Sequence, residues 1–427
     1  MNAEEIRTGN LTMNRKHKII AGVYAAMVCL APLTFAAAQD STLSDAVTSG
    51  KAHVALRFRY EYVDQDGFAK NANAAPLRIR LNYQTGNWRN WSAFGEFDHV
   101  AEVFLDSYNS GAGTSPGRTQ YPVVADPKGS DLNQMYLQYS PSDDWQLRLG
   151  REKITLDNHR FIGNVVWRQN EQTFDGLSLR VDSFSNTSLF YSYIENVNRI
   201  FGDSVPAGDH GTNTHLLNAK VDLNDSWEVT PYVYYIDNED VASLSTSSYG
   251  ARLTGKFAVG EGTVSLQAEF ATQSDAADNP VSYDADYAHI NGLWTLKNGL
   301  AFGAAFESLG GDAVSSGMAF RTPLATLHAF QGWADQFLST PDSGIDDLYL
   351  TVKYKVASWN LQAVYHDFSS EAGSGDFGTE LDVSAGRKLG ERYGLLFKAA
   401  LFNADSASPL PATVDTDKFW IMLTAKY

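Results

Sequence analysis

Residues 51–62 read KAHVALRFRYEY, and every second side chain in this stretch is apolar or aromatic. A period of two places the two sets of side chains on opposite faces of a β-strand. Leu56 and Phe58 belong to the apolar set, whereas Arg57 and Arg59 belong to the other. Because a charged side chain that faces the middle of a bilayer costs about 2–4 kcal/mol, the pattern predicts a membrane strand whose arginines point away from lipid.

Segments of this kind follow one another from residue 51 to the C-terminus, about eighteen in all, and the connections between them alternate in length. Long connections cover 105–130, 153–172, 196–212 and 309–345. The intervening connections are short: Asn87–Asn90, Pro141–Asp143, Ser183–Asn186, Asn224–Ser226, Gly260–Gly262, Lys297–Asn298, Ala357–Ser358 and Gly390–Glu391. The sequence therefore predicts an all-β fold: a single antiparallel transmembrane β-barrel of about eighteen strands, with short periplasmic turns and long extracellular loops.

The N-terminus has the pattern of a secretory signal peptide. Basic residues at 15–18 precede an apolar run over 19–35, and the small residues Ala36, Ala37 and Ala38 follow it. The only cysteine, Cys29, lies inside this segment, so the exported chain is expected to hold no disulfide. The predicted parts are a signal peptide over 1–38, a short segment over 39–50 and the barrel domain over 51–427.

The amino-acid composition limits which cellular location and which binding partners fit this chain. The formal net charge is −17, which argues against nucleic acid as a partner because such binding needs a cationic face. Aromatic residues make up 12% of the chain, as the two aromatic girdles of a barrel require. The chain ends on Tyr427, which resembles the C-terminal signal that barrels present to their assembly machinery. We expect the bacterial outer membrane, with lipid as the surrounding partner.

A second strand repeats the pattern of the first. Arg78 and Arg80 alternate with Leu77, Ile79 and Leu81, so four arginines on adjacent strands are expected to share one wall of the lumen. They could form a cationic ladder that lowers the barrier for anions. They could equally pair with lumenal acids and simply hydrate a polar interior. The acidic candidates are Glu61, Glu96, Asp98 and Glu152.

Arg151 departs from the pattern. Strict alternation places it with Leu149 on the lipid face, where a charge is costly. Either Gly150 marks a bulge that turns Arg151 inward, or the strand has already left the bilayer; the bulge is the favoured prediction.

Two of the long connections are too apolar for solvated tips. Residues 153–172 contain Phe161, Ile162 and Trp167, so this loop is predicted to fold inward, pack on the wall and constrict the pore. In 309–345 the apolar residues between Leu327 and Leu338 recur at helical spacing. They predict a short amphipathic helix, which would either cap the loops or plug the barrel.

In these loops the chain resembles the alginate export family of outer-membrane proteins. The matching stretches are Leu149-Gly-Arg-Glu through Arg160-Phe-Ile-Gly-Asn, Trp167-Arg-Gln-Asn-Glu-Gln-Thr-Phe-Asp-Gly, and Arg321-Thr-Pro through Gly332-Trp-Ala-Asp. The resemblance implies a monomeric eighteen-stranded barrel with an arginine-rich channel for an anionic uronate polysaccharide. The positions expected to line the channel are Arg57, Arg59, Arg78, Arg80, Arg148, Arg151, Arg160, Arg168 and Arg180, with Lys398 on the polar face of a later strand.

The sequence predicts passive transport and no catalytic residue, cofactor or metal site. It lacks the H-E-x-x-H, G-x-S-x-G and P-loop motifs of common enzymes. The acidic cluster over 275–286 fits a solvated loop better than a Ca²⁺ site. The expected solute is an oligo- or polyuronate or another small anion, moving outward or inward. The alternatives are a weakly selective general porin, or a plugged structural or adhesive barrel that acts through its surface loops.

Overall fold

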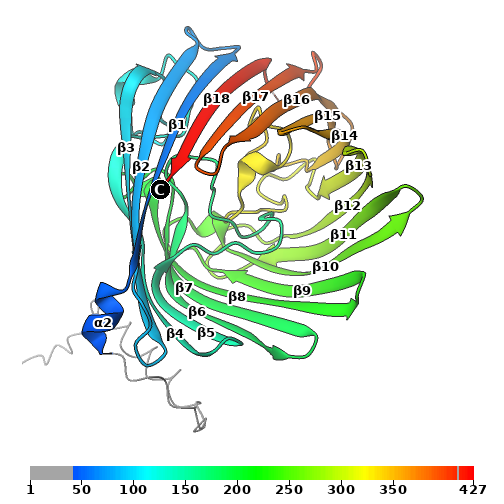
Figure 1. Ribbon diagram of the computed structural model, residues 1–427. Helices are drawn as coiled ribbons and strands as arrows, with labels where there is room; N and C mark the ends of the chain where they lie inside the picture. The colour runs from blue at the N-terminus through cyan, green and yellow to red at the C-terminus, as the bar shows by residue number, and fades with distance from the viewer. Residues whose placement is uncertain (1–41, 411–412) are drawn as a thin grey trace, which may run out of the picture. The chain divides into compact units, whose positions relative to one another are not determined.

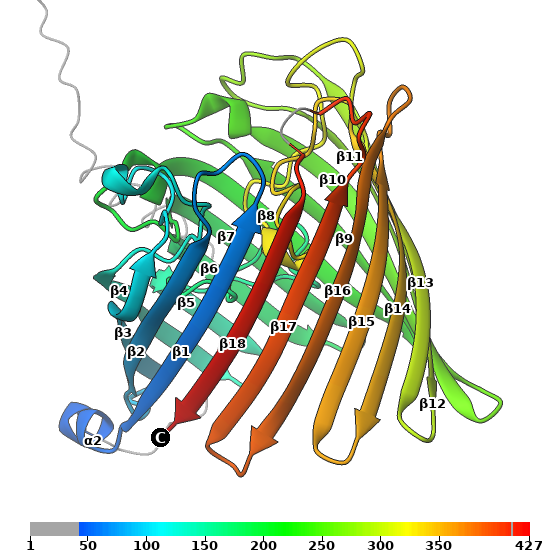
Figure 2. The same cartoon turned by 90° about the horizontal axis from the view of Figure 1, so that it is seen from above.

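The first strand pairs with the last, and this pairing closes the sheet into a barrel. The computed structural model describes residues 42–410 and 413–427, and the strands of this part form one eighteen-stranded antiparallel sheet (Figure 1). Strand β1 pairs with both β2 and β18, which lie side by side in Figure 2. The predicted eighteen-stranded barrel is confirmed. The predicted signal peptide lies outside the described residues.

The bounds of the strands are β1 (Lys51–Gln65), β2 (Ala72–Gln84), β3 (Trp91–Ser107), β4 (Gly129–Ser142), β5 (Trp145–Glu152), β6 (Thr173–Phe184), β7 (Thr187–Asn198), β8 (Asp209–Asn224), β9 (Trp227–Ile236), β10 (Thr246–Val259), β11 (Gly262–Asp275), β12 (Asp284–Leu296), β13 (Leu300–Leu309), β14 (Ile345–Val356), β15 (Trp359–Ser369), β16 (Asp376–Leu389), β17 (Tyr393–Ala404) and β18 (Thr416–Lys426). The helical elements are the α-helix α2 (Leu43–Thr48) and the 3₁₀ turns η2 (Pro116–Arg118), η3 (Pro206–Gly208), η4 (Ala242–Leu244) and η5 (Leu327–Ala329). None of the helices in the described ranges is long and apolar enough to cross a membrane.

Loop length follows the predicted alternation. The chain needs only Gly260 and Glu261 between β10 and β11, and Gly260 takes the positive φ of 55° that such a tight turn favours. The long connections, such as 153–172 and 310–344, lie at the other end of the strands, and Figure 2 shows the short hairpins gathered at one rim. The short-turn rim is the periplasmic side of a barrel of this kind, and the long loops mark the outer side.

The outer surface of the barrel carries the apolar set of each strand. Met135 and Ile290 are each 61% exposed and Leu350 is 56% exposed. A contiguous apolar surface of this extent is unfavourable in water, whereas lipid covers it at no cost. The alternation predicted from residues 51–62 thus continues around the barrel.

The hydrophobic core lies inside the barrel, because the inner loops pack against inward-facing side chains. The Phe161 ring lies 5.2 Å from that of Tyr232 and 5.3 Å from that of Tyr287, centroid to centroid. The two inner loops are residues 153–172 and 310–344. From the second of them, the Phe337 ring lies 4.8 Å from that of Phe368. The prediction that residues 153–172 fold inward and pack on the wall is confirmed. A barrel of this width needs such loops, since wall side chains alone cannot fill it.

The predicted bulge at Gly150 is wrong. The register runs without interruption from Leu147 to Arg151, with Arg151 opposite Met135 on β4 and Asp175 on β6. The irregularity of the β4–β5 pairing lies elsewhere, between Tyr139 and Ser142 of β4. Arg151 therefore shares the outward face of Met135, and its Nε lies 2.7 Å from Asp175 Oδ1. Gly150 has a different role: an added Cβ there would lie 2.3 Å from the Met135 carbonyl oxygen, so glycine permits close backbone approach.

The predicted amphipathic helix between Leu327 and Leu338 is also wrong, because only the 3₁₀ turn η5 forms there. Gln331, Gly332 and Asp335 take positive φ angles of 48°, 77° and 63°, which a right-handed helix cannot contain. The apolar side chains still point to the interior, but an irregular backbone places them there.

Candidate functional site

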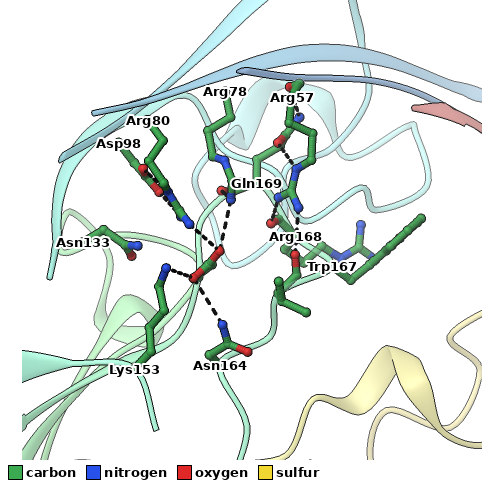
Figure 3. Close-up of polar contacts among 12 residues, drawn as sticks. Arg57, Arg78, Arg80, Asp98, Asn133, Lys153, Asn164, Trp167, Arg168 and Gln169 are labelled. Atoms are coloured by element: carbon green, nitrogen blue, oxygen red, sulfur yellow. Dashed lines mark hydrogen bonds and ion pairs between the residues drawn. The ribbon is translucent and has the colours of Figure 1, made fainter. Parts of the chain in front are cut away.

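Arginines of the first two strands hold the backbone of an inner segment, residues 166–171, called here the clamped segment. Arg57 Nη1 donates to the Val166 carbonyl oxygen at 2.8 Å, and Arg57 Nε donates to Gln169 Oε1 at 2.9 Å. Arg78 Nη1 donates to the Gln169 carbonyl oxygen at 3.2 Å. Figure 3 shows these side chains extending from the wall toward the loop. The fork of a guanidinium suits this task, since it offers several donors in one plane.

Arg59 adds a contact to the same segment and to a third loop. It donates to the Trp167 carbonyl oxygen and pairs with Asp126, and its guanidinium lies 4.8 Å from the centre of the Trp167 ring. Asp126 Oδ1 in turn accepts the Gln169 backbone N–H at 2.7 Å. Burial alone would raise the pKa of Asp126, but Arg59 and other arginines hold it below its usual value. The carboxylate therefore stays ionised and ties the β3–β4 connection to the clamped segment.

Glu171 ends the clamped segment as a shared partner of three cations. Its Oε1 lies 2.8 Å from Arg80 Nη1 and 3.2 Å from Arg78 Nη1, and its Oε2 lies 2.7 Å from Lys153 Nζ. Burial opposes ionisation, yet the attraction of these cations lowers the pKa of Glu171 to about 2. Arg80 is further held by Asp98, whose Oδ1 accepts from Arg80 Nε at 2.7 Å.

Together these arginines form the basic wall, and none of its members faces open solvent. Their exposed fractions are 7%, 0%, 8% and 7% for Arg57, Arg59, Arg78 and Arg80, respectively. Their donors go to loop carbonyl groups and to buried carboxylates. The predicted cationic wall thus lies inside the barrel, but its guanidinium groups are bound to other groups of the protein.

Asp335, on the second inner loop, joins that loop to the clamped segment and to the barrel. Its Oδ2 lies 2.9 Å from Arg168 Nη2 and 2.8 Å from Lys418 Nζ of β18. Its Oδ1 lies 2.7 Å from His328 Nδ1. One carboxylate therefore links two loops and a strand, and its removal would leave buried cations without a partner.

Lys398 of β17 lies in an aromatic enclosure beside this carboxylate. Its Nζ lies 3.6 Å from the centre of the Trp333 ring, 4.3 Å from that of Trp167 and 2.7 Å from His328 Nε2. An ammonium group can only donate, so His328 Nε2 accepts and its Nδ1–H donates to Asp335. Burial lowers the pKa of His328 well below its usual value, in keeping with this neutral ring.

Carboxylates on β13 to β16 hold the second inner loop from the opposite side. Glu380 Oε1 accepts the Ala334 backbone N–H at 2.7 Å, and Glu307 accepts a hydrogen bond from Gln331 Nε2. Glu307 also binds the first inner loop, with its Oε1 2.8 Å from Arg160 Nε. Close approach requires Gly332, since an added Cβ there would lie 2.2 Å from Glu380 Oε2. We call this group the acidic wall: Glu307, Asp347, Glu380 and Asp382.

A cavity of about 290 Å³ lies between the strands β5 to β8 and residues 153–157 of the first inner loop. Its basic side chains form ion pairs but stay accessible to solvent. Arg180, paired with Asp182, is 56% exposed; Lys220, paired with Asp157, is 44% exposed; and Arg148, paired with Glu152, is 26% exposed. We call it the cationic pocket; among the described residues that line it, the charged ones are Arg148, Lys153, Arg180 and Lys220 against Glu152 and Asp157.

The sequence matches the family model described as Alginate export over residues 51–324. The chain belongs to the alginate export family. Membership in this family and the barrel fold place it in the bacterial outer membrane, where such barrels act as channels for small solutes rather than as enzymes. No curated protein matches the sequence.

Solved barrels from Pseudomonas aeruginosa share the fold. OccK9 (OpdG) is 13% identical with a TM-score of 0.68, and the match covers 89% of this chain and 99% of that one. OpdO is 13% identical with a TM-score of 0.67, covering 90% and 98%. OpdK, solved with vanillate, is 13% identical with a TM-score of 0.65, covering 89% and 99%. At this identity the likeness concerns the fold alone.

In this alginate export family barrel, the predicted lining residues divide into distinct groups. Arg148 and Arg180 reach the cationic pocket, whereas Arg151 lies on the outer face. The others are buried and bound to protein partners: Arg57, Arg59, Arg78, Arg80, Arg160, Arg168 and Lys398.

Several residues that hold the inner loops or line the cationic pocket were not predicted. Glu171 and Asp335 lie within the stretches that resemble the family, close in sequence to Arg168 and Trp333, respectively. That closeness was the one sign in the sequence that these acids take part in the site. Lys153 and Lys220 carry no local pattern that marks them. In residues 42–410 and 413–427, no group of three or more His, Cys, Asp or Glu side chains could hold a metal ion.

Proposed function

We propose that this barrel passes small anionic solutes by diffusion, and that the cationic pocket, not the basic wall, gives it anion preference. The observation that carries the proposal is the charge of the pocket. Among its described lining residues the basic side chains outnumber the acidic ones, and Arg180 and Lys220 are about half exposed. Cations in a narrow, low-dielectric passage attract anions more strongly than the same cations in open water.

The basic wall contributes little to this attraction. Arg78 and Arg80 share Glu171, and Arg59 is paired with Asp126. The basic side chains of the cationic pocket are paired too, so the difference lies in burial: the wall arginines are at most 8% exposed and are covered by the clamped segment, whereas those of the pocket are accessible to a solute. The role of the wall arginines in the proposal is mechanical: they keep the clamped segment across the lumen, where it narrows the passage.

The solute we favour is a small uronate or a short oligouronate. The family carries the name of alginate export, and a uronate presents the carboxylate that the cationic pocket would attract. Two inner loops inside the lumen favour small solutes over a polymer of large cross-section. The barrel would work as a single chain, and the direction of net flux would follow the solute gradient.

The test is a reversal potential in a planar bilayer under a salt gradient. We expect anion preference for the wild type and its loss in the double variant Arg148→Gln/Arg180→Gln. Arg151→Gln removes a positive charge from the outer face and serves as the matched control, with no expected change. A cation-selective wild type would overturn the proposal, and so would a double variant with unchanged selectivity.

Added oligoglucuronate tests the solute. Current block that weakens in the double variant supports passage through the cationic pocket, and absence of block argues against uronates. A wild-type barrel without conductance would mean that the inner loops plug the lumen, which contradicts transport altogether.

A further inference from the structure

A second cavity, of about 390 Å³, lies on the outer side of the clamped segment. We call it the outer pocket. Long connections supply most of its lining, with Gln65 and Lys418 coming from β1 and β18. Its cationic groups are Arg168, Arg199 and Lys418, and Asp335 is its carboxylate. A solute that enters from outside meets this cavity before it reaches the cationic pocket.

Two of the three cations already have a carboxylate partner. Arg168 Nη2 and Lys418 Nζ both lie within 3 Å of Asp335 Oδ2, at 2.9 Å and 2.8 Å. Arg168 also lies 3.3 Å from Glu61. These two side chains therefore present little free positive charge to the cavity.

Arg199 differs from them. It follows the last residue of β7, and its side chain donates to a single neutral group, the Pro323 carbonyl oxygen, at 3.3 Å from Nη1. Among the described residues, no carboxylate forms an ion pair with it. Burial lowers the pKa of Arg199, and no acidic neighbour offsets that effect. Arg199 is partly exposed and has no carboxylate partner in the described part of the chain, so its guanidinium remains available to an incoming anion.

The remainder of the outer pocket is largely apolar. Phe201, Leu327 and Leu338 line it, together with other apolar side chains such as Val123 and Ile200. An apolar cavity with one free, convergent charge is the usual form of a site for a small amphiphilic ligand. A sugar with hydroxyl groups on every side would leave many of them without hydrogen-bond partners there, which is unfavourable.

We propose that the outer pocket binds a small monocarboxylate with an apolar or aromatic body. The carboxylate lies on the Arg199 guanidinium as a bidentate pair, and the body packs against Phe201, Leu327 and Leu338. This inference rests on the proposed function and extends it: beside the uronates that the cationic pocket would attract, the outer pocket would retain a second class of carboxylate, one with an apolar body. Uronates, whose polar body suits the cationic pocket, would pass the outer pocket without being held there.

The experiment is single-channel recording with benzoate as the probe, added to the outer side. Glucuronate serves as the polar carboxylate and benzyl alcohol as the neutral counterpart. We expect transient current interruptions by benzoate that neither other compound produces with comparable affinity. Arg199→Gln should weaken benzoate binding roughly tenfold or more, because it removes the cation that pairs with the carboxylate. Arg199→Lys should restore part of the binding.

Arg321→Gln is the matched control, since Arg321 lies on the second inner loop but pairs with Asp342, and neither side chain lines the pocket. It should leave benzoate binding unchanged. Phe201→Ala should weaken benzoate binding more than acetate binding. A gel shift on heating verifies that each barrel is folded. If Arg199→Gln does not fold, the comparison of Arg199→Lys and Phe201→Ala with the wild type decides the matter.

Unchanged benzoate binding in the Arg199 variants overturns the inference, and so does the absence of benzoate binding to the wild type. An equal loss of glucuronate and benzoate binding also overturns it. The reversal potential separates this failure from failure of the proposed function: an anion-selective barrel that ignores benzoate retains the channel proposal and loses only the outer pocket.

Discussion

The basic wall and the acidic wall hold the two inner loops by opposite halves of the peptide group. On β1 and β2, Arg57 and Arg78 donate to carbonyl oxygens of the clamped segment. On β16, Glu380 accepts the backbone N–H of Ala334. In each case a buried charge satisfies irregular backbone that no sheet or helix would satisfy. Charged side chains on the inner wall of a barrel can therefore bind the protein's own loops. The sign of the charge on that wall does not by itself reveal the charge of the solute.

The largest effect is expected when substitutions in the basic wall release the clamped segment. Arg78→Gln/Arg80→Gln leaves Glu171 buried with Lys153 as its remaining cation. Breaking a buried ion pair typically costs about 3–5 kcal/mol, so we expect a marked loss of unfolding free energy and a higher single-channel conductance. Denaturant titration in lipid and bilayer recording measure the two effects. Wild-type conductance in the double variant would mean that the segment does not depend on the wall.

Two substitutions, one at a partner of the basic wall and one in the acidic wall, compare how much each contact stabilises the fold. Glu171→Gln removes the charge that three cations share, whereas Glu380→Gln keeps an oxygen that can accept the Ala334 N–H. We expect losses of roughly 2–4 kcal/mol for Glu171→Gln and about 1 kcal/mol for Glu380→Gln, again from denaturant titration. Equal losses would show that the two walls hold their loops in the same way.

Acid should loosen the clamp only at low pH. The pKa of Glu171 falls from its ordinary 4.5 to about 2 in the folded protein. A lowered carboxyl pKa stabilises the fold fully above the ordinary value, and that stabilisation is lost as the pH falls from about 4.5 through about 2. Conductance recorded against pH should therefore stay constant above pH 4.5 and rise below it. Glu171→Gln should remove this acid response, and an onset near neutral pH would contradict the assignment to Glu171.

The smallest effect is expected on the outer face. Arg151 pairs with Asp175 where both side chains are about one-quarter exposed, and such pairs contribute about 0–1 kcal/mol. Arg151→Gln should thus change neither conductance nor selectivity and should lower stability by at most about 1 kcal/mol. A large change would place Arg151 in the solute path after all.

Alternation along the chain was sufficient to predict the barrel and the faces of its strands. Strict alternation also gives the observed outer face for Arg151. The prediction failed there because Gly150 was interpreted as a β-bulge. The partners of the wall arginines could not be predicted in the same way. Arg57 meets Gln169 across 112 residues, through a loop in which His159 and Val165 take positive φ angles. Such a path depends on contacts between distant residues, which no local pattern records.

The failed helix between Leu327 and Leu338 has a similar cause. Helical spacing there marks side chains that face the interior, but Glu380 and Asp382 compete for the backbone N–H groups of Ala334 and Trp333. Buried carboxylates from strands far along the chain therefore override the local preference for a helix.

The central claim is that the cationic pocket controls selectivity while the basic wall controls the width of the passage. Reversal potential and conductance, recorded together for two arginine pairs, test it most directly. We predict that Arg148→Gln/Arg180→Gln loses anion preference at nearly wild-type conductance, and that Arg78→Gln/Arg80→Gln gains conductance and retains anion preference. The account is contradicted if the second pair abolishes anion preference and the first pair leaves it intact.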